Sequence, residues 1–158
     1  MNSKLKSYIY SILIALGVGG LSALITSGSM DIYKEINTPP LSPPSVLFPI
    51  VWSVLFVLMG ISAAMVYNAE SALVRERNSA LLTYGLSLIF NFFWSIIFFN
   101  MRMYLFAFIW LVILWLLILL TIIKYYNINK LAALLQIPYL LWVTFAGYLN
   151  LGIYILNK

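Results

Sequence analysis

Long apolar runs separated by short polar breaks dominate this chain. Five runs reach the length of about 20 residues that a helix needs to cross a bilayer core of about 30 Å. They span residues 8–27, 46–67, 80–100, 104–123 and 131–155. None alternates apolar and polar residues in the two-residue period of barrel strands. The pattern therefore predicts an all-α integral membrane protein, with residues 1–158 forming a single domain of five transmembrane helices.

The first run is the only one that resembles part of a signal peptide, since it follows Lys4 and Lys6. It is longer than the apolar region of a signal peptide, and no A-x-A cleavage pattern follows it. We therefore interpret this run as the first spanning helix.

One connection is much longer than the others. Residues 28–45 separate the first two runs, and four prolines lie between Pro39 and Pro44. Proline fixes φ and lacks a backbone N–H, so this loop is predicted to be stiff. Two interpretations remain open, a rigid linker and a lid over a cavity between helices.

Composition excludes most soluble functions. The chain is 64% hydrophobic and 8% charged, whereas soluble domains carry about 25% charged residues. This low charge excludes a cytosolic enzyme and a disordered chain, and the nine Lys and Arg form no basic stripe for nucleic acid.

The chain contains no Cys and no His, and its four carboxylates lie between the apolar runs. We therefore expect no metal site, no cofactor and no proton relay inside the membrane.

Basic residues are distributed unevenly between the two ends of the predicted bundle. Six of them fall on the side of the N-terminus and three on the other side. The larger group is Lys4, Lys6, Arg75, Arg77, Lys124 and Lys130, and the smaller group is Lys34, Arg102 and Lys158. Because positive charge favours the cytoplasmic side, this split predicts a cytoplasmic N-terminus.

Three runs carry aromatic and polar side chains on one helical face each. These faces are Trp52, Phe56, Met59 and Ala63; Asn91, Trp94, Ser95 and Phe98; and Pro138, Trp142, Ala146 and Asn150. Bundle packing or lipid contact is the common explanation for such faces. The alternative is a pocket for a flat apolar ligand, because buried amides and indole N–H groups need partners.

Small residues gather in the first run, at Gly17, Gly19 and Gly20. Such residues let membrane helices approach closely. Two roles remain open for these glycines: packing against another helix of the same bundle, or forming the contact face of a dimer.

Three motifs are more specific than these patterns. They are P-P-x-x-x-F-P-x-V-W from Pro43 to Trp52, N-F-F-W-S-x-x-F-F from Asn91 to Phe99, and P-Y-L-L-W-V-T-F-A-G-Y-L-N from Pro138 to Asn150. Together with five helices in this length, they resemble the TspO/MBR family. That family comprises bacterial tryptophan-rich sensory proteins and the mitochondrial translocator protein, or peripheral benzodiazepine receptor.

The resemblance implies a five-helix bundle whose first loop folds over a ligand pocket. It implies binding of porphyrins such as protoporphyrin IX, of isoquinoline carboxamides and, in some members, of sterols. It also implies a homodimer, and the short N-terminus suits a bacterial cell membrane. Carried over by position, the ligand-binding residues are Trp52, Phe56, Asn91, Trp94, Phe98, Trp142 and Ala146, with Tyr33, Pro43 and Pro44 from the loop.

The leading hypothesis is therefore a membrane receptor or sensor for porphyrins and similar flat hydrophobic ligands. One alternative is light- and oxygen-dependent porphyrin degradation, for which the resemblance implicates Trp52 and Trp142 as catalytic residues. Conventional acid–base catalysis is not expected, because no His and no intramembrane carboxylate is present. Transport of tetrapyrroles or sterols and a purely structural role are further alternatives.

The chain departs from the family pattern at four positions. Ile32 and Leu41 stand where the family loop has Trp, Thr38 stands where it has Lys, and Leu88 stands where many members have Gln. From these departures we expect a lid with less aromatic surface and a pocket that lacks one polar group.

Overall fold

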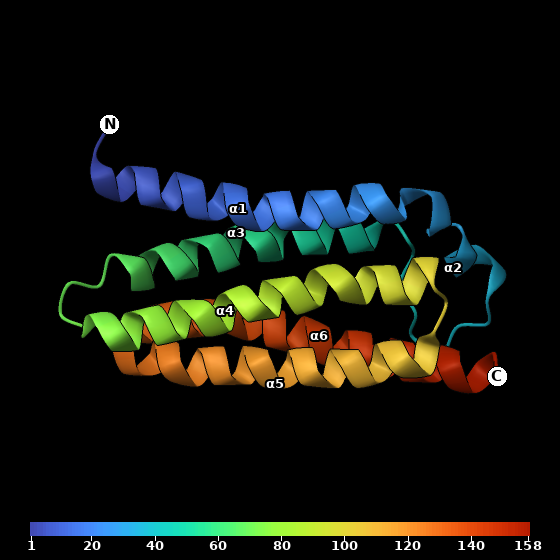
Figure 1. The fold of residues 1–158 in the computed structure, drawn as a ribbon. Helices are drawn as coiled ribbons and strands as arrows, with labels where there is room; N and C mark the ends of the chain where they lie inside the picture. Colours follow the sequence, from blue (N-terminus) through green and yellow to red (C-terminus); the bar gives the residue numbers. More distant parts are fainter.

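A computed structural model describes residues 1–158 and contains five long helices that lie side by side (Figure 1). All five are long and apolar enough to cross a membrane, which confirms the predicted fold class. The helices are α1 (Ser3–Thr26), α3 (Leu47–Tyr67), α4 (Val74–Ser95), α5 (Tyr104–Ile128) and α6 (Lys130–Leu156).

Helix ends differ from the predicted ranges because hydropathy detects the apolar part of a helix and not its polar turns. Helix α4 begins at Val74, six residues before the predicted start, and its first turns include Arg75 and Arg77. These residues favour helix but are too polar to count as part of an apolar run. Helices α5 and α6 are separated by Asn129 alone, whose side chain accepts a hydrogen bond from the Ala132 N–H at 3.1 Å and so caps α6.

Helix α4 continues into a π-helical turn, η2 (Ile96–Asn100), where the sequence predicted an uninterrupted helix. Such turns are rare and often lie at functional sites. Here the turn carries Phe98 and Phe99, two neighbouring aromatic residues that the site uses.

The linker, defined here as residues 27–46, contains more helix than the sequence predicted. It begins with a 3-10 turn, η1 (Ser27–Ser29), and continues with a one-turn helix, α2 (Ile32–Glu35). Ile32 is only 4% exposed, so the one-turn helix has an apolar anchor in the bundle. The prolines that follow keep the remainder of the linker non-helical. Figure 1 shows the whole linker at one end of the bundle, near the C-terminus.

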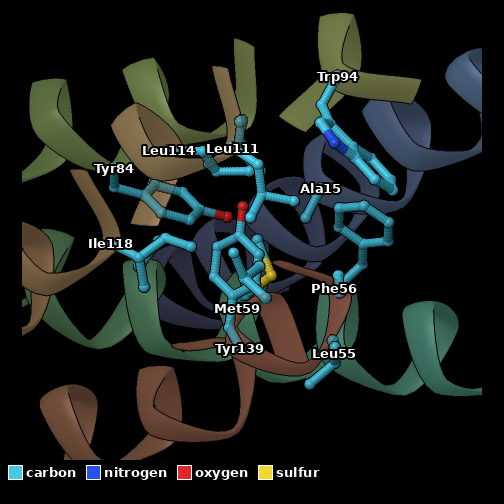
Figure 2. Packing of buried hydrophobic residues seen from close by; sticks show 14 of the residues in the cluster. Ala15, Leu55, Phe56, Met59, Tyr84, Trp94, Leu111, Leu114, Ile118 and Tyr139 are labelled. Carbon is cyan, nitrogen blue, oxygen red and sulfur yellow. The ribbon is translucent and has the colours of Figure 1, made fainter. Parts of the chain in front are cut away.

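The core lies where α3, α4, α5 and α6 meet, and α1 packs mainly on α3. In Figure 2, Phe56 and Trp94 face each other at one end of the core, near Ala15 of α1, and Tyr84 lies toward the other end. Large apolar residues such as Leu24 and Leu82 point outward. In water this surface would favour aggregation, whereas in a bilayer lipid tails cover it.

Two glycines explain how closely α1 approaches α3. A Cβ atom at Gly60 would lie 2.5 Å from the Ile12 Cα atom, and one at Gly19 would overlap the Phe56 ring. By contrast, a Cβ atom at Gly17 or Gly20 would have open space around it. Of the three N-terminal glycines, only Gly19 is therefore needed for close packing inside the bundle.

Candidate ligand cavity

A cavity of about 410 Å³ lies between α1, α3, α4 and α6, next to the linker. This volume falls in the range of about 300–1,000 Å³ that small-molecule sites occupy. Aromatic residues make up much of its wall, and Asp31 and Lys34 of the linker are its only charged residues. The aromatic lining residues are Tyr33, Phe48, Trp52, Phe56, Trp94, Phe98, Phe99 and Trp142.

Two stacked aromatic pairs form opposite parts of this wall. On α3, the rings of Trp52 and Phe56 lie 5.6 Å apart with an interplanar angle of 27°. Where α4 passes into η2, Trp94 and Phe98 lie 5.4 Å apart at 28°. Both pairs join residues four apart, which share one side of a helix. The cavity therefore has flat apolar surfaces on two of its helices.

A third aromatic group connects α6 to the linker. The ring of Phe48 lies 6.0 Å from Trp142 and 5.3 Å from Tyr33. The Tyr33 hydroxyl donates to the Pro43 carbonyl at 3.1 Å, which fixes the tyrosine against the linker. The Trp142 Nε1 atom is buried and has no hydrogen-bond partner in the protein, so its donor capacity is unused.

Asn91 contributes a free acceptor to the wall. Its Nδ2 atom donates to the Tyr139 hydroxyl at 3.0 Å. Because that bond uses only the amide nitrogen, Oδ1 remains without a protein partner and can accept a hydrogen bond from a ligand.

The amide of Asn150, by contrast, is used entirely within the protein. Its Oδ1 atom accepts from Trp94 Nε1 at 3.1 Å, and its Nδ2 atom donates to the Tyr104 carbonyl at 2.9 Å. Asn150 thereby connects α4, α5 and α6 and fixes the orientation of the Trp94 indole.

Eight of the ten predicted site residues line this one cavity, and their contact with a ligand stays a prediction. They are Tyr33, Trp52, Phe56, Asn91, Trp94, Phe98, Trp142 and Ala146. Pro43 and Pro44 lie outside the lining. Pro43 acts indirectly, because its carbonyl accepts the hydrogen bond from the Tyr33 hydroxyl.

The sequence analysis missed the contribution of α1 to the cavity. Gly19, Ser22, Ala23 and Thr26 all belong to the lining. These residues are three, one and three positions apart, which places them on a single helical face. The same helical spacing had indicated the cavity-lining faces of the other helices. All four residues are small and lack aromatic and amide groups, so their pattern predicts close helix packing or a dimer face and not a ligand site.

Three of the departures from the family pattern lie outside the cavity lining. Leu41 is 84% exposed and Ile32 is 4% exposed, and neither lines the cavity. Leu88 is 5% exposed and lies in the hydrophobic core, also outside the lining. The expected loss of aromatic lid surface and of one polar group stays a prediction.

Comparison with known proteins agrees with this architecture. The family model described as "TspO/MBR family" matches residues 11–156. The tryptophan-rich protein TspO of Chlorobaculum tepidum is 35% identical over 158 residues, covering 99% of each chain. The TspO of Archaeoglobus fulgidus is 34% identical, covering 94% of this chain and 95% of its own. The translocator protein of Bos taurus is 30% identical, covering 89% of this chain and 83% of its own. This multi-pass membrane protein belongs to the TspO/MBR family.

Proposed function

We propose that this protein is a membrane receptor of the sensor type that binds porphyrins, such as protoporphyrin IX, and similar flat hydrophobic molecules. The observation that carries the proposal is the cavity of about 410 Å³ with stacked aromatic pairs from α3 and α4 and Trp142 from α6 around it. A relative in Cereibacter sphaeroides is named tryptophan-rich sensory protein, which supports a sensor role.

The polar groups of the cavity suit a metal-free tetrapyrrole. The Asn91 Oδ1 atom can accept from a pyrrole N–H. The Trp142 N–H has no partner in the protein, so a ligand oxygen or nitrogen that reaches it can accept its hydrogen bond. Most of the affinity then comes from apolar burial and ring stacking, and each aromatic contact contributes about 0.5–1.5 kcal/mol beyond the buried area.

Titration of the purified protein with protoporphyrin IX tests this proposal. We expect saturable quenching of Trp fluorescence, and the porphyrin absorbance band provides a readout that does not depend on the number of Trp residues. Trp142→Phe should raise Kd by about 2- to 13-fold. Trp115→Phe is the matched control, because Trp115 lies outside this cavity and donates to Thr144. Absence of saturation, or equal shifts for the two variants, would refute porphyrin binding at this site.

A second candidate function is light- and oxygen-dependent degradation of the bound porphyrin, with Trp52 and Trp142 as the reacting residues. The observation in its favour is that both indoles line the same cavity, so both can contact one ligand. Under illumination in air, wild-type protein should bleach protoporphyrin IX faster than Trp52→Phe does. Equal bleaching rates at equal occupancy would eliminate this candidate.

We further propose a homodimer in a bacterial cell membrane, with the N-terminus in the cytoplasm. Because the chain contains no Cys, a single Cys introduced at Lys4 or at Lys158 can be labelled without background. A membrane-impermeant maleimide added to intact cells should label the C-terminal position and not the N-terminal one. Light scattering of the detergent-solubilised protein measures the oligomeric state.

A further inference from the structure

The C-terminal end of α6 is joined to the linker by three separate contacts. They connect Tyr148, Gly152 and Asn157 with linker residues 37–40. Tyr148 and Gly152 are one turn apart on the same face of α6. The contacts lie outside the cavity lining, so they cannot be explained as ligand contacts.

Asn157 forms two hydrogen bonds with one residue of the linker. Its Nδ2 atom donates to the Asn37 carbonyl at 2.8 Å, and its Oδ1 atom accepts from the Asn37 N–H at 3.0 Å. Both backbone groups of Asn37 are thus satisfied by one side chain, immediately before a segment whose prolines provide no N–H. A side-chain amide is suited to this contact because it offers a donor and an acceptor together.

Gly152 allows the linker backbone to lie directly on α6. A Cβ atom at this position would be 2.6 Å from Pro39 Cγ and 2.7 Å from Pro39 Cβ. The proline ring has no rotamer that would relieve this contact, since the ring is fused to the backbone. Pro39 is itself buried, so any larger residue at 152 has to push the linker outward.

Tyr148 completes the set by donating from its hydroxyl to the Pro40 carbonyl at 2.6 Å. Residues 37–40 are therefore fixed to α6 at a backbone amide, a ring and a carbonyl. On either side of this fixed segment, the linker carries Tyr33 and α3 carries Phe48, two residues that line the cavity beside Trp142.

We propose that Asn157 and Gly152 are positioning residues of the ligand site: they fix the linker to α6 and thereby control how fast a ligand leaves the cavity. This inference rests on the proposed binding function. Helix α6 holds Trp142 and Ala146 in the wall and the fixed linker segment at its end, so one helix sets the distance between the cavity and its cover.

The dissociation rate of protoporphyrin IX is the first test. Asn157→Ala loses both hydrogen bonds to the linker and a third bond, of 2.7 Å, to the Ile153 carbonyl of α6. We expect koff to rise roughly 5- to 100-fold from the loss of the two linker bonds. Gly152→Ala should also raise koff. The matched controls are Lys158→Ala, next to Asn157, and Gly85→Ala, a helical glycine with open space around it. Both controls should leave koff unchanged.

A ligand-independent measurement separates failure of this inference from failure of the binding proposal. A spin label on Glu35→Cys, at the end of α2, reports motion of the linker, and the chain has no other Cys. The label should become more mobile in Asn157→Ala and Gly152→Ala and not in the controls.

The koff and spin-label measurements together show which proposal fails. If wild-type protein binds no porphyrin, the binding proposal fails, and label mobility alone decides whether α6 positions the linker. Unchanged mobility in both variants overturns that positioning. Increased mobility with an unchanged koff overturns control of ligand release. Circular dichroism confirms that each variant remains helical.

Discussion

Gly60→Ala tests whether the close approach of α1 and α3 depends on a missing side chain. The added Cβ atom would lie 2.5 Å from Ile12 Cα and 2.9 Å from Ile12 N. Both are backbone atoms, so no side-chain rotation removes the overlap. Ordinary van der Waals contact requires at least 3.4 Å. Helices α1 and α3 must therefore move apart where Gly60 meets Ile12.

The size of the effect follows from two opposing contributions. Overpacking a well-packed contact costs about 1–3 kcal/mol, and a backbone overlap belongs in the upper part of that range. Replacing a helical glycine by alanine returns about 0.5–1 kcal/mol. We expect Gly60→Ala to lower the free energy of unfolding by about 1–2 kcal/mol. Gly17→Ala, with open space around its Cβ atom, should leave it unchanged or raise it by up to about 1 kcal/mol.

Reversible unfolding in mixed detergent micelles, followed by circular dichroism while the denaturing detergent is increased, measures both variants. The comparison between them cancels the change in helix propensity, because each replaces glycine by alanine inside α1 or α3. If Gly60→Ala is as stable as Gly17→Ala, the close contact does not set the spacing of these helices and the reasoning is refuted.

Three further substitutions test buried polar contacts by the same unfolding measurement. Asn150→Leu leaves Trp94 Nε1 without a partner and removes the hydrogen bond from Asn150 Nδ2 to the Tyr104 carbonyl, and it should cost about 1–3 kcal/mol; no loss would contradict the connecting role of Asn150. Gln136→Met removes a buried Oε1 that has no partner but also the 3.3 Å bond from Nε2 to Ser62 Oγ, and the two effects should offset each other to within about 1 kcal/mol. Ser62→Ala removes a 2.7 Å bond to the Ala132 carbonyl and leaves Gln136 Nε2 without an acceptor, so it should cost about 1–3 kcal/mol; a neutral result would count against these bonds.

The five helices could be predicted from the sequence because lipid offers the backbone no hydrogen-bond partners. A chain in that environment forms helices wherever it is apolar for long enough. The faces of α3, α4 and α6 could be predicted too, since Trp52, Trp94 and Trp142 each belong to a helical repeat of which at least two residues line the cavity. In both cases the information lies within one segment of the chain.

Features that depend on contacts between distant segments could not be predicted in the same way. The π-helical turn that carries Phe98 and Phe99 lies inside a continuous apolar run, and no residue pattern there indicates a departure from regular helix. Similarly, the fit of Gly152 against Pro39 joins residues more than a hundred positions apart. The residues around Gly152 and around Pro39 form no sequence pattern that would indicate a contact between the two.

Leu41 shapes the linker through its backbone, and its side chain does not line the cavity. Leu41 has φ of 68°, a left-handed conformation that costs a leucine energy and that glycine or asparagine adopts more easily. This conformation turns the chain directly after residues 37–40, which α6 fixes, and sends the linker toward Pro43 and α3. The side chain at the turn is exposed and lies outside the cavity lining. Residue 41 therefore contributes a backbone turn to the linker, whereas the aromatic lining of the cavity comes from the long helices, the π-helical turn and Tyr33.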